Sequence, residues 1–172
     1  MRQALLIFLL LLCASSYAME VDQAYRLIPH QRTVFQLHQS AIPASEAQQV
    51  GRLLSLAEKA MVERVDAMVN GAGKTDYFSQ IDGILWQIDQ LRVPTQVHAA
   101  RDHIQKAVQQ HRAFFELQNA TGNQVEANRQ QLVQSSHRHL ISAYQQLMQT
   151  YPEETKHNKQ AFFDYLCALD FI

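Results

Sequence analysis

The residues of this chain that are best suited to chemistry are its eight histidines and two cysteines. Imidazole nitrogens bind transition metals and haem iron, and they also act as general acids and bases near neutral pH. Eight histidines is a high number for 172 residues, so each type of site that histidine supports has to be weighed. The histidines are His30, His38, His98, His103, His111, His137, His139 and His157.

Haem is one ligand that such histidines hold in helical proteins. Covalent attachment requires a Cys-x-x-Cys-His run, which is absent here. Non-covalent haem needs two axial ligands on facing helices. His111 and His139 each lie on or near the apolar face of a predicted helix, and Met61 and Met68 are alternative axial ligands. Because a single histidine on an apolar face usually packs in the core, we expect His111 to serve packing rather than metal binding.

Other metal sites have weaker signatures in this sequence. A carboxylate-bridged di-iron site uses Glu-x-x-His on each of two helices. Only Glu154 and His157 have that spacing, in a predicted first turn where acidic residues are common anyway. His137 and His139 fall on different faces of their helix. A surface copper, nickel or zinc site stays open, but the pattern assigns no metal ligand and no cofactor.

Motifs for catalysis are also missing. There is no Gly-x-Ser-x-Gly sequence for a serine nucleophile. The segment Gly71–Thr75 resembles the end of a phosphate-binding loop, but it lacks the preceding glycine and follows a predicted helix. We expect it to be a turn that ends the helix. The sequence therefore predicts no catalytic or cofactor-binding residues, and we expect that the protein is not an enzyme.

The N-terminus has the pattern of an export signal. Arg2 precedes an unbroken apolar run from Ala4 to Leu12, and small residues follow at Ser16 and Ala18. A positive start, a short apolar region and small residues three and one positions before the cut are typical of a secretory signal peptide. We therefore expect a signal peptide at 1–18 and a mature chain of 19–172 that begins at Met19.

The two cysteines fall on either side of this predicted cleavage. Cys13 follows Leu12 instead of the small residue that lipoprotein processing favours, so cleavage after Ala18 is the preferred reading. Cys167 is then the single cysteine of the mature chain, which excludes an intrachain disulfide there. Its neighbours are apolar, and we expect it to be buried and unpaired. An intermolecular disulfide is the alternative.

Helical periodicity dominates the mature chain after residue 44. Apolar residues recur every three or four positions, and turn-forming Gly, Asn and Pro separate the periodic segments. Residues 19–44 are less regular because Pro29 and Pro43 interrupt them. The expected helices run from an N-cap at Ser45 to Asn70, from about Thr75 or Asp76 to before Pro94, from Pro94 to about Asn119, from about Gln124 to Thr150, and from Pro152 to about Leu169.

One large aromatic residue does not follow the apolar stripe of its segment. Trp86 lies between Ile84 and Ile88, which belong to the main stripe. We expect it to mark a second buried face of that helix. Contact with a partner is the alternative.

Composition limits the fold and the ligand class. The chain has 47% hydrophobic residues, 18% charged residues and a net charge of −1. This balance argues against nucleic-acid binding, which needs an excess of Lys and Arg. Only five glycines and four prolines leave little material for the turns of an all-β fold. Short connections favour antiparallel neighbours, so we expect one all-α domain: an up-and-down bundle of about four long helices with shorter flanking helices.

These features point to a small exported protein of the periplasm or extracellular space. The leading hypothesis is a non-catalytic binding or interaction module with a protein partner or self-association. The alternative is a metal- or haem-binding four-helix carrier or sensor. No further run of about 18 apolar residues follows the signal, so we expect no membrane span in the mature chain.

Overall fold

The computed structural model describes residues 43–73 and 76–152. This part is 84% helical, with four α-helices and no strand, which confirms the all-α class for the described residues. The predicted signal peptide at 1–18, Cys167 and the predicted helix after Pro152 lie outside them. None of the described helices is both long enough and apolar enough to cross a bilayer. The helices are α3 (Ala44–Asn70), α4 (Tyr77–Gln90), α5 (His98–Glu116) and α6 (Asn123–Thr150), with a 3-10 turn, η1 (Thr95–Val97), before α5.

The first described helix begins two residues earlier than expected. Pro43, not Ser45, occupies the capping position, and its carbonyl accepts the backbone N–H groups of Glu46 and Ala47 at 2.9 and 3.1 Å. Proline suits this place because its fixed φ is compatible with the start of a helix and it needs no N–H partner. Ser45 therefore lies inside the first turn, and the prediction that it caps the helix is wrong.

Glycine and proline lie at the predicted turns, although α4 ends at Gln90 instead of just before Pro94, and α5 ends at Glu116 instead of about Asn119. Gly71 has φ of +86°, and its N–H donates to the carbonyl of Ala67 at 2.9 Å. Gly122 has φ of +121° immediately before α6. Residues with a side chain rarely adopt such angles, so both turns favour glycine. Pro94 closes the extended connection after α4, and its carbonyl accepts the N–H of Val97 to start η1.

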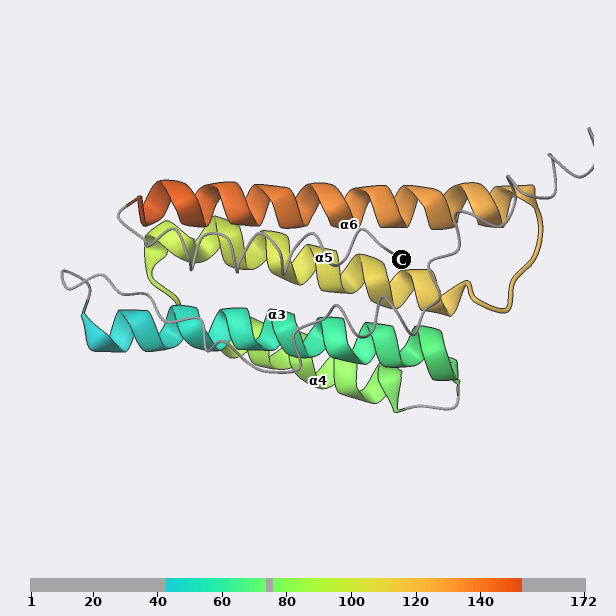
Figure 1. Cartoon of the computed structure of the whole chain (residues 1–172), viewed down its shortest axis with the longest axis horizontal. Coiled ribbons are helices and arrows are strands. Elements are labelled where there is room, and N and C mark those ends of the chain that lie inside the picture. Colours follow the sequence, from blue (N-terminus) through green and yellow to red (C-terminus); the bar gives the residue numbers. More distant parts are fainter. Residues whose placement is uncertain (1–42, 74–75, 153–172) are drawn as a thin grey trace, which may run out of the picture.

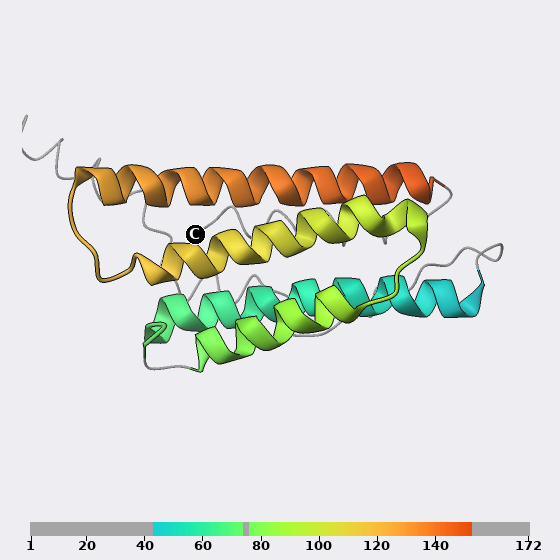
Figure 2. The ribbon, with the colours of Figure 1, turned by 180° about the vertical axis from the view of Figure 1, so that it is seen from behind.

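Consecutive helices lie side by side and run in opposite directions (Figure 1). The helices α3 and α4 form one layer, and α5 and α6 form the other; Figure 2 shows the same order from behind. The helix α5 packs most extensively on α6 and also contacts α3 and α4. Side chains that point inward from α5 can therefore meet all three other helices.

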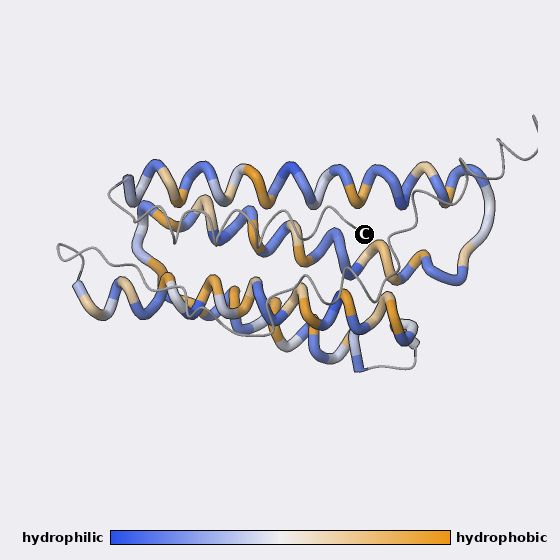
Figure 3. The backbone as a smooth tube through the Cα atoms, in the orientation of Figure 1, coloured by the Kyte–Doolittle hydropathy of each residue, from blue (hydrophilic) through white to orange (hydrophobic). Residues whose placement is uncertain are grey.

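The core is built from the apolar stripes of the four helices. In Figure 3 apolar segments recur along each helix between polar ones. Most residues of the predicted stripes are buried, and the others, such as Leu85, Val125 and Leu132, are partly buried. Full burial of a Val, Leu or Ile side chain stabilises the fold by about 1.5–3 kcal/mol. Fully buried members include Val50, Leu53, Val65, Ile81, Ile84, Ile88 and Val97.

Trp86 contradicts the expectation of a second buried face, because 66% of its surface is exposed. Ile84 and Ile88 are fully buried against the neighbouring helices. A step of two residues turns an α-helix by about 200°, so a residue midway between two buried positions points away from them. The helix α4 has no described neighbour on that outer side.

Candidate functional site

A cluster of four buried polar residues lies in the core, and each of the four helices contributes one. Arg64 comes from α3, Tyr77 from α4, His111 from α5 and Ser136 from α6, and all four are buried. We call these residues the core polar cluster. Polar groups inside a core are costly unless they find partners, so their contacts indicate what the cluster does.

His111 and Ser136 form a buried hydrogen bond between α5 and α6. The Nε2 atom of His111 lies 2.6 Å from the Oγ atom of Ser136. His111 is 6% exposed and Ser136 is 2% exposed. Burial lowers the pKa of His111 well below its usual value, and the positive charge of Arg64 lowers it further. The imidazole is therefore neutral at neutral pH, and its Nε2 either accepts the hydroxyl proton or donates to Oγ.

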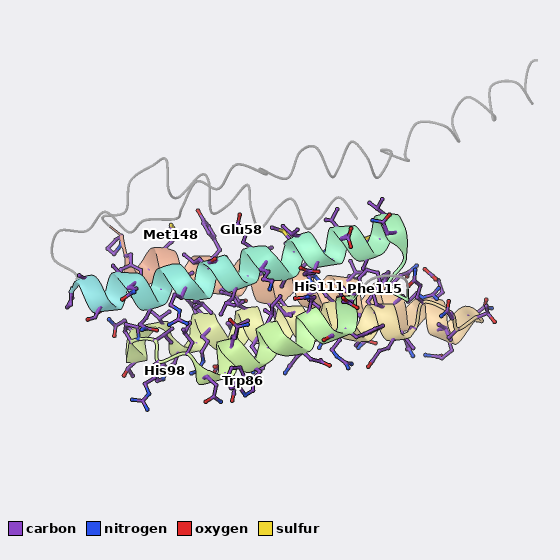
Figure 4. The ribbon with its side chains drawn as sticks, turned by 90° about the horizontal axis from the view of Figure 1, so that it is seen from below. Glu58, Trp86, His98, His111, Phe115 and Met148 are labelled. Atoms are coloured by element: carbon purple, nitrogen blue, oxygen red, sulfur yellow. The ribbon has the colours of Figure 1, made fainter. Side chains whose placement is uncertain are left out.

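A serine hydroxyl bonded to an imidazole is also the arrangement of an activated nucleophile. Such a hydroxyl must reach a substrate, whereas Ser136 and His111 are both closed off from solvent. Figure 4 shows His111 between the helices, near Phe115. In this geometry the pair joins α5 to α6 and fixes their register. His111 and Ser136 both fall within the apolar periodicity of their helices. A serine at such a position is expected to be buried, and a buried hydroxyl needs a hydrogen-bond partner.

Tyr77 supplies the largest aromatic surface of the cluster. Its ring packs against Phe115, with centroids 4.6 Å apart, and against Phe78 at 5.3 Å. Its hydroxyl has no hydrogen-bond partner among the described residues. Burial raises the pKa of Tyr77, while the charges of Arg64 and Arg112 oppose that rise. The phenol consequently stays protonated and neutral.

Ion pairs on the surface position α5 and the loop that follows it. The Nε atom of Arg112 donates to Asp82 of α4 at 2.6 Å, and its guanidinium also contacts Glu116 and the ring of Phe78. Arg129 of α6 donates to backbone carbonyls of the α5–α6 connection, which lack partners within the helix. These contacts hold the outer sides of the helices that enclose the cluster.

A second histidine contact joins α5 and α6 nearer the surface. The Nδ1 atoms of His103 and His139 lie 2.9 Å apart, and both residues are partly buried. The ring centroids are 5.2 Å apart and the planes differ by 39°. The pKa of His139 is lowered by burial first, then by the charges of His103, Lys106 and Arg138. Sequence reasoning considered His139 together with His111, whereas the structure places it against His103.

The remaining sequence candidates lie apart from these contacts. The Nε2 atom of His98 is 3.1 Å from the carbonyl oxygen of Val93. Met61 is buried in α3 and Met68 is partly buried there. No group of three or more His, Cys, Asp or Glu within the described ranges is arranged to hold a metal ion. His30, His38 and His157 lie outside those ranges.

Trp86, on the outer face of α4, is the most exposed large hydrophobic residue in the described part of the chain. Trp86 lies on this outer side (Figure 4) and is more exposed than Val69 and Ile141, which are 42% and 40% exposed. The helix carries Asp82 and Asp89 and has no Lys, Arg or His. The face therefore combines a large aromatic ring with acidic and amide groups.

No protein-family model, curated protein or solved structure matches this chain.

Proposed function

We propose that this protein is an exported, non-catalytic module that binds a partner protein through the outer face of α4. In this proposal the helices α3–α6 form a single up-and-down bundle that presents this face. The exposed indole of Trp86 is the observation that carries the proposal.

Physical arguments favour a binding role for this tryptophan. Tryptophan is among the residues that contribute most to protein interfaces, where its ring fills a pocket and is shielded from water. Of the two acidic residues on α4, Asp82 is ion-paired with Arg112 of α5, whereas Asp89 takes part in no described ion pair. Complementary charge steers association. The partner is therefore a protein with an apolar pocket for the indole and a basic group beside that pocket for Asp89.

A non-catalytic role is supported by the state of the core polar cluster. Its hydroxyl–imidazole pair resembles a nucleophile and its base, but both groups are enclosed by packed helices. Export is supported by the sequence pattern of residues 1–18 alone. The two supports are independent of the Trp86 face.

The test is co-purification from the native host after cross-linking, with wild type, Trp86→Ala and the matched control Ile141→Ala. Both substituted residues are exposed, so each change should leave the free energy of unfolding within about 0.5 kcal/mol. We expect wild type and Ile141→Ala to retain the same partner and Trp86→Ala to lose it. A partner retained equally by all three proteins would refute the proposal.

Fluorescence then tests whether the indole itself is covered. Trp86 is the single tryptophan of the chain, so emission selected for tryptophan reports this face alone. Addition of the purified partner, or of a fragment of it without tryptophan, should shift the emission to shorter wavelength as water is excluded. Complex formation without a shift in the tryptophan emission would show that the partner binds at a different surface of the protein. A concentration-dependent dimer that requires Trp86 would show that the outer face of α4 binds a second copy of this chain instead.

A further inference from the structure

The contact between His103 and His139 plays no part in the proposed interaction of α4. It lies where α5 packs on α6, and it brings two imidazole nitrogens within 2.9 Å of each other. Both rings are partly buried, so solvent reaches them. Two imidazoles that converge in this way either share a hydrogen bond or bind one metal ion together.

The separation of the nitrogens discriminates between metal geometries. Metal–imidazole bonds are about 2.0–2.1 Å long. Adjacent corners of a square-planar or octahedral site with such bonds are about 2.8–3.0 Å apart, and corners of a tetrahedral site are about 3.3–3.4 Å apart. The observed 2.9 Å is compatible with two adjacent corners of a square-planar or octahedral site and is shorter than a tetrahedral edge. Square-planar coordination by nitrogen is typical of Cu²⁺ and Ni²⁺, and Cu²⁺ binds most tightly of the divalent series.

We propose that His103 and His139 form a two-imidazole binding site for Cu²⁺ across the α5–α6 contact. Water or an external ligand fills the other coordination positions. The Nδ1 atoms now point at each other, so both rings turn slightly toward solvent to direct their lone pairs at the ion. The ring that donates the hydrogen bond moves its proton from Nδ1 to Nε2, and no net proton is lost.

Two cationic side chains, Lys106 and Arg138, lie near His139. Their positive charges repel a divalent cation. Removal of the charge of Lys106 should therefore strengthen Cu²⁺ binding if the ion lies at this place.

The experiment is a titration of the untagged exported protein with Cu²⁺ in the presence of a competing chelator, followed by electron paramagnetic resonance. We expect one equivalent bound, with hyperfine splitting from two nitrogens. His103→Gln and His139→Gln should each weaken binding about tenfold or more, since even groups that only support a ligand are worth that much. The matched control His98→Gln, also on α5, should bind as wild type does. Lys106→Gln should bind more tightly, and Zn²⁺ should bind more weakly than Cu²⁺.

Several outcomes would overturn the proposal. Copper that stays bound to both His103→Gln and His139→Gln would belong to other histidines or to the N-terminus. A spectrum with a single nitrogen, or Zn²⁺ binding as tight as Cu²⁺, would exclude the two-imidazole square-planar site. The melting temperatures of the metal-free variants should match that of the wild type within a few degrees. This control shows that a loss of Cu²⁺ binding is not caused by unfolding of the variant. The Trp86 experiments are unaffected by any of these results.

Discussion

Replacement of His111 by leucine should remove a defined part of the pH dependence of stability. The folded imidazole is neutral because burial and the charge of Arg64 lower its pKa well below the usual 6.5. In the unfolded chain the same group takes up a proton near pH 6.5. As the pH falls through that value, the unfolded state binds more protons than the native state, so His111 makes the native protein progressively less stable toward acid.

The size of this loss of stability follows from the pKa of His111 in the unfolded chain. If the folded imidazole stays neutral down to pH 5, His111 costs about 2 kcal/mol of stability between pH 8 and pH 5. The pKa of His139 is lowered as well, and it contributes in the same direction. That contribution is present in both proteins and cancels in their difference.

At pH 8 the substitution His111→Leu should change stability by no more than about 1.5 kcal/mol, or increase it. The hydrogen bond of Nε2 to Ser136 is lost. The Ser136 hydroxyl can instead turn to the carbonyl of Leu132, one helical turn earlier, and leucine buries more apolar surface.

Urea denaturation at pH 8, 6.5, 5.5 and 5 measures this difference, provided that unfolding is two-state. The curve of stability against pH should be flatter for His111→Leu than for wild type by about 2 kcal/mol over the range. His98→Leu is the control for replacing another histidine of the same helix by leucine. Equal slopes for wild type and His111→Leu would show that His111 is not held neutral in the core, and the reasoning would fail.

Two further predictions concern Tyr77 and the N-terminus. Tyr77→Phe removes a buried hydroxyl that has no described hydrogen-bond partner, so it should leave stability unchanged or raise it by about 1 kcal/mol in thermal or urea unfolding; a loss above that size would reveal a partner for the hydroxyl. The intact mass of the exported protein should equal that of a chain beginning at Met19, and a lipid-modified mass beginning at Cys13 would contradict cleavage after Ala18.

The helices and their ends could be predicted from the sequence because local physics determines them. Apolar residues at a spacing of three or four specify which side of each helix is buried. Gly71 and Gly122 adopt backbone angles that other residues rarely accept, and Pro94 cannot continue a helix. The N-cap was predicted two residues too late, at Ser45, because serine is a common capping residue, whereas the helix begins directly after Pro43.

The burial of Trp86 was predicted wrongly from the periodic pattern. Its position between Ile84 and Ile88 already placed it on the opposite side of α4 from the buried stripe. Whether that side is covered depends on which helices pack around α4. In the described structure α4 packs on α3 and α5 through the isoleucine stripe, which leaves the indole exposed.

The partners of the polar residues were decided by tertiary structure. His111 and Ser136 are 25 positions apart in sequence, and His103 and His139 are 36 apart. Whether such pairs come into contact depends on how far each of the two antiparallel helices is rotated about its axis and on how far one is shifted along the other. The sequence determined that each helix buries one face, because burial depends on periodicity within a segment. It did not determine which residues face each other across α5 and α6, because that depends on how the side chains of two segments interlock.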